Sequence, residues 1–256
     1  MKDASHGKVF LIGAGPGDPD LLTVKALRLL QSADVVVFDR LVSPAIMALI
    51  PEKVRRVDVG KAAGYHTLPQ GEINTLLVRL AGEGLSVVRL KGGDPLIFGR
   101  GSEEAAELAL AGVPHEYVPG ITSAQGAAAS TGVPLTHRGL ATSVRYVTGH
   151  RARDAALDLD WASLAAPDTT LVIYMGAMNI AEIAARLIEH GLPADTPAMA
   201  VASATTPEEA HAVATLATLP AAIAAHRLAA PILIVIGRVV SLYGSGQAAI
   251  PEALHA

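Results

Sequence analysis

The chain has 256 residues, which suits one large domain or two smaller ones, and its 51% hydrophobic content is ample for a packed core. That content excludes disorder for most of the chain, and the absence of cysteine excludes disulfides, thiolate metal sites and a cysteine nucleophile. A net charge of −4, from 20 basic and 24 acidic side chains, argues against bulk nucleic-acid binding. The polar start predicts no signal peptide, and no apolar run is long enough to predict a membrane span. The sequence therefore predicts a soluble, cytoplasmic protein.

Strands and helices alternate along the first half of the chain. This alternation of strands and helices is typical of a mostly parallel sheet. Thr23 is the expected N-cap of the first helix, because its hydroxyl can accept a backbone N–H that has no partner inside the helix. Strands are predicted at residues 8–12, 33–38, 85–90 and 115–118, and helices at residues 24–31, 70–83 and 102–111.

The pattern changes after residue 119, and a second α/β unit is expected there. The whole chain is therefore predicted to form two α/β domains with mostly parallel or mixed sheets, at residues 1–119 and 120–256. A polar, aspartate-rich stretch at residues 151–168 interrupts the second one. Its predicted strands are residues 143–148, 170–175, 198–202 and 232–236, and its predicted helices are residues 122–130, 179–190 and 216–226.

Residues 89–104 form the most informative segment. An apolar strand ends in the glycine pair Gly92 and Gly93, a proline turn follows, and a helix begins near Ser102. Open α/β sheets build ligand crevices in this way at the carboxyl ends of their strands. Two glycine pairs, together with Asp94, Arg100, Glu103 and Glu104 in one short loop, favour a ligand site over an ordinary connection.

Residues 13–18 are a partial match to a dinucleotide-binding turn. The third glycine of that pattern is replaced by Asp18, and Pro16 and Pro19 stand where its helix would begin. The turn favours a nucleotide-like ligand without phosphates, although a tight strand exit would also explain it. Asp39 follows the second strand, where it is either a functional carboxylate or the cap of a turn.

Three later segments add polar groups. Residues 60–74 form a glycine-flanked loop with Lys61, Tyr65, His66 and Gln70, which suggests the wall of an active site. A Pro-Gly turn opens the helix at Thr122 or Ser123, whose backbone N–H groups can bind a carboxylate. Residues 134–151 concentrate cations, and an arginine fork binds carboxylates bidentately. The histidines show no metal-ligand spacing, and no serine-nucleophile or phosphate-loop motif is present.

Together these segments resemble the tetrapyrrole (corrin/porphyrin) methylase family over nearly the whole chain. The resemblance implies a homodimer that binds S-adenosylmethionine in the cleft between its two domains and needs no metal. It implies transfer of two methyl groups to C2 and C7 of uroporphyrinogen III, giving precorrin-1 and then precorrin-2, with S-adenosylhomocysteine as the second product. The segments that carry the likeness are residues 13–23, 38–42, 60–74, 88–104, 118–124, 132–138, 148–150 and 174–176.

The resemblance also implies roles for individual residues. Asp39 with Lys61 is the family's acid–base pair, and Glu103 with Arg100 is the competing pair, so both stay open. Substrate carboxylates are expected at Arg100, Arg138, Arg40 and His66. Ala204 departs from the glycine that relatives often carry at its position. The implied cofactor contacts are Pro16, Gly92, Gly93, Asp94, Ile97, Thr122, Ser123, Met175 and Ala204.

Two other functions remain open on the sequence. One is a sister methylase that acts on a later corrin intermediate such as precorrin-4, although residues 60–74 and 98–104 favour uroporphyrinogen III. The other is a non-catalytic regulator that binds a tetrapyrrole or an adenosyl group. The presence of Asp39, Lys61, Arg100 and Glu103 favours an enzyme. Whether sirohaem, cobalamin or haem d1 synthesis uses the product is left undecided.

Overall fold

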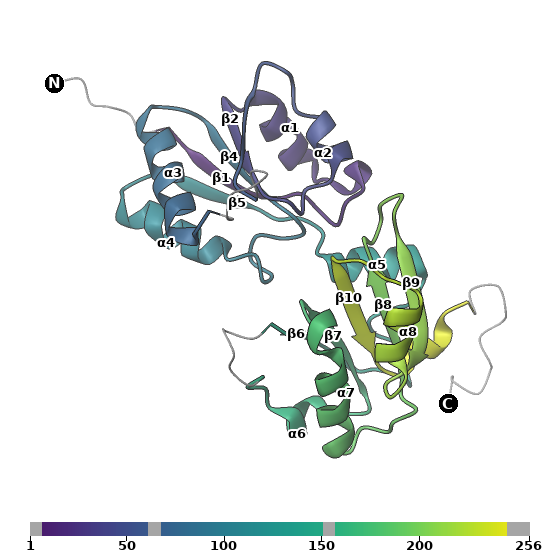
Figure 1. Ribbon diagram of the computed structural model, residues 1–256. Coiled ribbons are helices and arrows are strands. Elements are labelled where there is room, and N and C mark those ends of the chain that lie inside the picture. The colour runs from purple at the N-terminus through teal and green to yellow at the C-terminus, as the bar shows by residue number, and fades with distance from the viewer. Residues whose placement is uncertain (1–6, 61–67, 151–156, 245–256) are drawn as a thin grey trace. The chain divides into compact units, whose positions relative to one another are not determined.

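The structure is a computed structural model that describes residues 7–60, 68–150 and 157–244. The chain divides into two compact units, Met1–Thr122 and Ser123–Ala256, called unit 1 and unit 2 below (Figure 1). Each unit contains its own five-stranded sheet.

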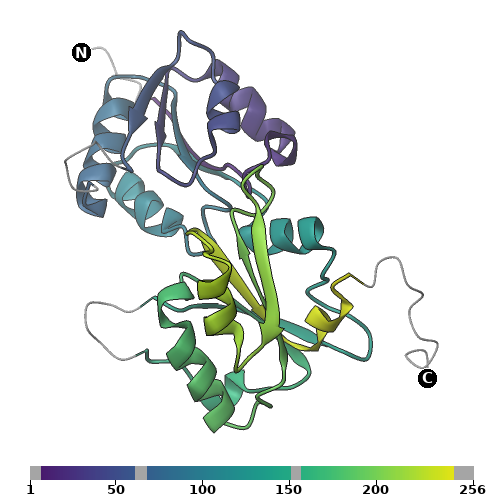
Figure 2. The same ribbon diagram turned by 45° about the vertical axis from the view of Figure 1, so that its right-hand side comes forward.

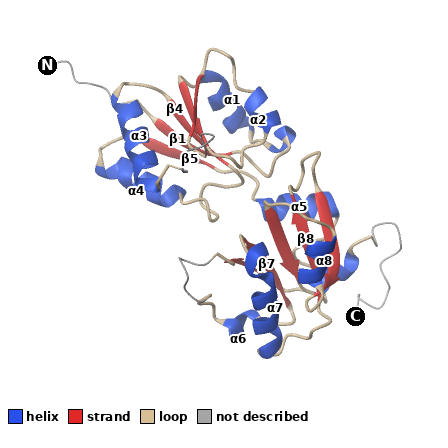
Figure 3. Cartoon of the chain, viewed as in Figure 1, coloured by secondary structure: helices blue, strands red, loops and turns tan. Residues whose placement is uncertain are grey.

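The sheet of unit 1 has the strand order β3-β2-β4-β1-β5, and every pair of neighbours is parallel, as the alternation of strands and helices predicts. Figure 3 shows these strands with helices on either side. The strands are β1 (Val9–Gly13), β2 (Val35–Phe38), β3 (Arg55–Asp58), β4 (Val87–Lys91) and β5 (His115–Val118).

Helices cover both faces of this sheet because both faces of its strands are apolar. Alternate residues of β2 show the division: Val35 and Val37 belong to one core cluster, and Val36 belongs to the other. The first cluster lies under α3 (Gln70–Gly82) and α4 (Gly101–Leu110), and the second under α1 (Val24–Ser32) and α2 (Pro44–Ala48).

The connections of β1 and β4 make one end of the sheet suitable for a ligand. These strands are neighbours, but the chain leaves β1 for β2 on one side and leaves β4 for β5 on the other side. A crevice forms outside the carboxyl ends of two such strands, since their loops separate there. The loops concerned are residues 14–23 and 92–100, which hold the two glycine-rich segments of the sequence.

Most predicted elements of unit 1 are confirmed, and three short ones are missing from the prediction. Thr23 caps α1 as expected, with its hydroxyl accepting the Ala26 N–H at 3.1 Å. The missing elements are α2 and β3, together with the short 3-10 helix η1 (Pro19–Leu21). Neither α2 nor β3 has a periodic apolar pattern long enough to read, because α2 has five residues and β3 is a largely exposed edge strand.

The sheet of unit 2 is mixed. Its order is β6-β7-β10-β8-β9, with β6 parallel to β7 and the other neighbours antiparallel. Consequently β7 and β8 run in the same direction and end at the same edge of the sheet. The strands are β6 (Ser143–Thr148), β7 (Thr169–Tyr174), β8 (Pro197–Ala202), β9 (Ala210–Thr215) and β10 (Ile232–Ile236).

One apolar cluster joins this sheet to three helices, α6 (Trp161–Leu164), α7 (Ile180–Glu189) and α8 (Leu219–Ala225). The helix α5 (Ser123–Thr131) contacts β10, and the turned view shows it on the side of the sheet away from α7 (Figure 2). The sequence does not predict α6, which lies in the polar stretch, or β9, whose alanines and polar residues give a weak strand pattern. Two 3-10 helices, η2 (Ala177–Asn179) and η3 (Arg238–Leu242), complete the described part of unit 2.

Within the described residues, no helix is both long enough and apolar enough to cross a membrane.

Candidate functional site

The loops that follow β1, β4 and β5 are joined through glycine backbone. Gly15 and Gly93 exchange two hydrogen bonds, with N···O distances of 3.1 and 2.7 Å. A Cβ atom on Gly13 would lie 2.5 Å from the carbonyl oxygen of Gly93 and 2.6 Å from the nitrogen of Gly120. Only glycine permits backbones to approach this closely. The three loops therefore form one glycine-lined surface at the carboxyl end of the sheet.

Asp94 fastens two of these loops together. Its Oδ1 accepts the Leu96 N–H at 2.8 Å, and its Oδ2 accepts the Gly120 N–H at 3.0 Å. Both carboxylate oxygens are thus engaged with backbone donors, so Asp94 shapes the loop that follows β4. The cofactor contacts that the sequence predicts in unit 1 all lie on the loops after β1, β4 and β5: Pro16, Gly92, Gly93, Asp94, Ile97 and Thr122.

Backbone strain gathers beside the predicted site residues. Non-glycine residues seldom adopt positive φ, and such residues concentrate at functional sites. In the described part of the chain, the non-glycine residues with positive φ are Arg227 and five others that lie in or next to predicted site segments. These five are Phe98 (φ 52°), Arg100 (φ 58°), Met175 (φ 54°), Ser203 (φ 48°) and Thr205 (φ 66°).

In unit 2, Tyr174 links two of the predicted cofactor residues, Met175 and Ser123. This tyrosine ends β7, and its hydroxyl accepts the Ala124 N–H at 3.3 Å, which links Met175 to the start of α5 beside Ser123. Its ring packs edge-on against Tyr146, with 5.8 Å between ring centroids, and burial raises the pKa of Tyr146. Ala204 is buried and follows β8, so it lies at the same edge of the sheet as Met175.

A buried cluster of charges lies under α3 and α4. Arg89 and Lys91 alternate with apolar residues in β4 and are only 2% and 5% exposed, and Glu104 of α4 is fully buried. The Glu104 Oε1 atom accepts hydrogen bonds from Arg89 Nε at 3.1 Å, Lys91 Nζ at 2.9 Å and Gln70 Nε2 at 3.1 Å. Burial, followed by the charge of Arg89, lowers the pKa of Lys91.

The predicted catalytic carboxylate Asp39 lies at the edge of this cluster. It follows β2, the neighbour of β4, and its side chain is 26% exposed. Its Oδ2 accepts from Arg89 Nη2 at 3.4 Å, and its Oδ1 accepts the Leu41 N–H at 3.1 Å. The structure thus confirms Asp39 as a turn cap and leaves its carboxylate partly exposed, and its functional role stays a prediction. Lys61 and His66 lie outside the described residues.

The competing pair, Arg100 and Glu103, lies at the exposed start of α4. Arg100 Nε and Nη2 contact the two carboxylate oxygens of Glu103 at 2.9 and 2.7 Å. This hydrogen bonding lowers the pKa of Glu103 and raises that of Arg100. Since a carboxylate with a lowered pKa is a weaker proton acceptor, Glu103 is less suited than an unpaired carboxylate to take a proton.

The remaining predicted anchors are exposed cations. Arg40 in unit 1 and Arg138 in unit 2 have no side-chain hydrogen bond or ion pair within residues 7–60, 68–150 and 157–244. Arg145 differs, because its Nη1 donates to the carbonyl oxygen of Ser163 at 2.7 Å and fastens β6 to α6. Arg40 and Arg138 are therefore available for an anionic ligand, whereas Arg145 is already engaged.

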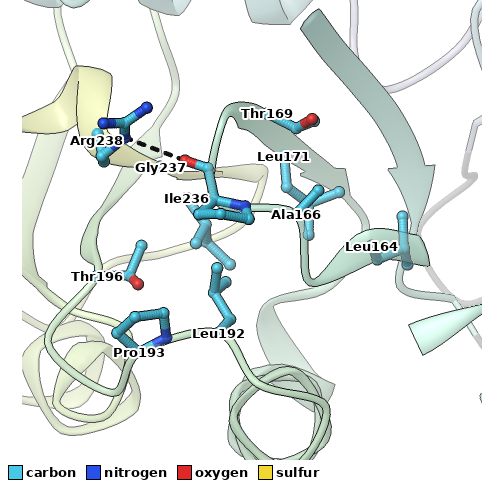
Figure 4. Close-up of a pocket in the computed structure, with 11 residues that line it drawn as sticks. Leu164, Ala166, Thr169, Leu171, Leu192, Pro193, Thr196, Ile236, Gly237 and Arg238 are labelled. Atoms are coloured by element: carbon cyan, nitrogen blue, oxygen red, sulfur yellow. Dashed lines mark hydrogen bonds between the residues drawn. The ribbon is translucent and has the colours of Figure 1, made fainter. Parts of the chain in front are cut away.

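The described residues contain no group of three or more histidine, aspartate or glutamate side chains placed to hold a metal. A small cavity of about 70 Å³ lies in unit 2, lined by Leu164, Thr196 and Arg238 among others (Figure 4). It adjoins the first residue of β7 and the last of β10, at the opposite edge of the sheet from Met175. None of the predicted site residues lines it.

Sequence reasoning missed Arg89, Lys91 and Tyr174 and gave Glu104 no separate role. A signal for the first two was present, because charged residues that alternate in an apolar strand must be buried and are rarely left unpaired. Nothing in the sequence indicates which acid they meet. Tyr174 resembles any strand-end aromatic residue, and its bond to Ala124 depends on how α5 packs against the sheet.

Comparison with known proteins agrees with this architecture. The family model of the Tetrapyrrole (Corrin/Porphyrin) Methylases matches residues 8–220. A uroporphyrinogen-III C-methyltransferase of Paracoccus denitrificans is 62% identical over 98% of this chain and 87% of its own length. A siroheme synthase of Azotobacter vinelandii is 57% identical over 92% of this chain, which spans only 51% of that longer relative.

A solved structure is similar as well. The crystal structure of a uroporphyrin-III C-methyl transferase from Thermus thermophilus, complexed with S-adenyl homocysteine, is 42% identical. It has a TM-score of 0.79, and the match covers 93% of this chain and 100% of that one. With the parallel sheet of unit 1 and the mixed sheet of unit 2, these matches show that the chain belongs to the tetrapyrrole (corrin/porphyrin) methylases.

Proposed function

We propose that this chain transfers two methyl groups from S-adenosylmethionine to C2 and C7 of uroporphyrinogen III, giving precorrin-2 through precorrin-1. The observation that carries the proposal is the 62% identity to the Paracoccus uroporphyrinogen-III C-methyltransferase, which extends over 98% of this chain. The glycine-lined loops, the strained backbone beside the predicted contacts and the available arginines support it.

The residues present suit the cofactor. A nucleoside with an amino-acid tail needs backbone groups at close range, and the side-chain-free surface at Gly13, Gly93 and Gly120 supplies them. When bound, S-adenosylmethionine supplies a methyl group on a sulfonium, which an electron-rich pyrrole carbon accepts with later loss of a proton. The proposed contacts are Pro16, Gly92, Gly93, Asp94, Ile97 and Thr122 in unit 1, and Ser123, Met175 and Ala204 in unit 2.

Arginines would hold the acceptor. Uroporphyrinogen III carries eight carboxylates, and the exposed guanidinium groups of Arg40 and Arg138 are suited to bind them bidentately. Arg100 is also proposed as an anchor, together with His66. Because Glu103 occupies the Arg100 fork, a substrate carboxylate that binds there displaces or shares this partner.

We assign removal of the macrocycle proton to Asp39, with Lys61 as its partner. The carboxylate of Asp39 is partly exposed and is oriented by Leu41 N–H and Arg89, whereas Arg100 lowers the pKa of Glu103. Holding the acceptor carbon in line with the methyl group supplies most of the rate enhancement, and proton removal adds to it.

The proposal is tested by incubating the purified protein with S-adenosylmethionine and uroporphyrinogen III without oxygen, then measuring the mass of the tetrapyrrole. The expected product has gained two methyl groups, after a transient species with one. A mixture without S-adenosylmethionine is the control. Recovery of unmethylated tetrapyrrole from the complete mixture would reject the proposal.

We further propose that the working form is a homodimer, as the family resemblance implies. Sedimentation equilibrium should give twice the mass of one chain. A single-chain mass at micromolar concentration would contradict this part of the proposal and leave the methyl-transfer assay to decide the rest.

A further inference from the structure

Arg89 is fixed on three sides inside unit 1. Its Nε donates to Glu104 Oε1 at 3.1 Å, and its Nη1 donates to the carbonyl oxygen of Leu90 at 3.2 Å. Its Nη2 then faces Asp39 Oδ2 at 3.4 Å. A guanidinium is planar and rigid, so two fixed nitrogens determine the direction of the third.

Glu104 holds this arrangement together. Its Oε1 receives donors from Arg89, Lys91 and Gln70, and its Oε2 has no partner in the described part of the chain. The cluster contains two cations, Arg89 and Lys91, and two carboxylates, Glu104 and Asp39. Glu104 therefore pairs with the positive charges of Arg89 and Lys91, which would otherwise have only the Asp39 carboxylate as a partner in the cluster.

We infer that Glu104 and Arg89 are positioning residues that keep the Asp39 carboxylate in one orientation and available to take a proton from the tetrapyrrole. The inference rests on the proposed function, since the role of Asp39 in the reaction is part of that proposal. Neither residue needs to touch either ligand, because Glu104 is fully buried and acts through Arg89.

Loss of the Glu104 charge has a defined physical consequence. The cations Arg89 and Lys91 would then face one carboxylate among the described members of the cluster, that of Asp39. A buried cation turns toward the remaining negative charge, because leaving it unpaired is costly. Asp39 would be pulled inward, away from its bond to the Leu41 N–H and from the substrate.

The test is Glu104→Gln, which keeps the shape of the side chain and removes its charge. We expect kcat to fall about 10–100-fold, the loss typical of residues that orient metal ligands and taken as the scale for one that orients a carboxylate. KM and the S-adenosylhomocysteine Kd should stay within about twofold of wild type. The matched control is Glu107→Gln, the same change at an exposed position one turn further along α4, which should keep wild-type kcat.

A second variant covers the case in which Glu104→Gln fails to fold. Arg89→Lys keeps a buried cation beside Glu104, but one ammonium cannot reproduce the fork that reaches Asp39, so kcat should fall by a similar factor. Wild-type kcat in the folded variants would overturn the inference. Equal losses in kcat, KM and cofactor affinity would also overturn it, since they would indicate a purely structural cluster.

Crystal structures of wild type and Glu104→Gln give a readout that does not depend on turnover. We expect the Asp39 carboxylate to leave the Leu41 N–H in the variant, and an unmoved carboxylate would contradict the inference. Failure of the proposed function looks different, because the wild type itself would then transfer no methyl group to uroporphyrinogen III.

Discussion

At the scale of single residues, the two carboxylates proposed for proton removal occupy different surroundings. Glu103 is exposed and bound at both oxygens by Arg100, which lowers its pKa. Asp39 has one oxygen on the Leu41 N–H and the other facing Arg89 at 3.4 Å. A base must release its partner to accept a proton, and the geometry makes this easier for Asp39.

This difference predicts unequal effects of neutralising the two acids. Asp39→Asn should lower kcat by about 10²–10⁴-fold, the usual contribution of a general base, while the S-adenosylhomocysteine Kd stays near the wild-type value. Glu103→Gln should have the smaller effect on kcat. Steady-state kinetics and calorimetric titration measure both quantities. A larger loss of kcat in Glu103→Gln would transfer the proton-removing role to the Arg100 pair.

Arg100 should separate acceptor binding from cofactor binding. In Arg100→Ala we expect kcat/KM for uroporphyrinogen III to fall at least about 30-fold, which corresponds to loss of about 2 kcal/mol from a charged contact. The S-adenosylhomocysteine Kd should change by less than about twofold, because the proposed cofactor contacts in this loop are mostly backbone groups. Equal losses in both would show that Arg100 serves the whole loop.

At the scale of elements, glycine contacts join the ends of β1, β4 and β5, where the proposed cofactor surface lies. A methyl group on Gly13 would overlap backbone atoms of Gly93 and Gly120, which cannot rotate away. Gly13→Ala should therefore lower the free energy of unfolding by about 1–3 kcal/mol and weaken cofactor binding. Urea unfolding and calorimetry measure these effects.

The control for this prediction is Gly82→Ala. Gly82 ends α3, and no atom lies within 4 Å of a Cβ built there. This change should raise the free energy of unfolding by about 0.4–1 kcal/mol, because alanine restricts the unfolded chain. Similar destabilisation in both variants would argue against close packing as the reason for glycine at position 13.

An ion cluster joins three elements at the surface of unit 1. Glu116 of β5 contacts Lys8, just before β1, at 2.6 Å and also contacts Lys25 of α1. The hydrogen bond from Lys25, followed by that from Lys8, lowers the pKa of Glu116 to about 2 from its usual 4.5. Because the folded-state pKa is the lower one, the stabilisation is complete above pH 4.5 and is lost as pH falls toward 2.

Glu116→Gln should therefore be less stable than wild type at pH 7, and the difference should shrink as the pH is lowered from 5 to 3. Urea unfolding at several pH values measures it. Glu107→Gln, which removes an exposed carboxylate without an ion pair among the described residues, should show no such trend. A difference that stays constant down to pH 3 would mean that the lysines do not stabilise the Glu116 carboxylate.

Several elements are predicted from the sequence with the observed bounds or cap. The predicted strands at residues 115–118, 143–148 and 232–236 have the observed bounds, and the helix after Thr23 has the predicted cap. Short or largely polar elements such as α2, β3, α6 and β9 escape prediction because their placement depends on packing against the rest of the unit.

The candidate site was predictable in a similar way. The close approach of the loops after strands β1, β4 and β5 could be foreseen from their glycines, since close backbone approach requires that residue. The partners of Arg89 and Tyr174 could not, because Glu104 and Ala124 meet them only through the packing of α4 and α5 on their sheets. The role of each predicted site residue stays a prediction until the variants are measured.

At the scale of the whole molecule, the proposed cofactor contacts are divided between two units, each with its own sheet and core. Apart from Ser123, which begins α5, they follow the carboxyl ends of strands that run in the same direction: β1, β4 and β5 in unit 1, and β7 and β8 in unit 2. Both units thus place proposed contacts on loops at the ends of strands. Such loops can vary without disturbing the cores.

The most direct test of the proposed reaction is to locate the transferred methyl groups. The protein is incubated with uroporphyrinogen III and S-adenosylmethionine whose methyl carbon is isotopically labelled, and the purified product is examined by carbon NMR. We expect two labelled methyl signals, assigned to C2 and C7 of the macrocycle. A label at another carbon, or labelling only when a later corrin intermediate replaces uroporphyrinogen III, would contradict it.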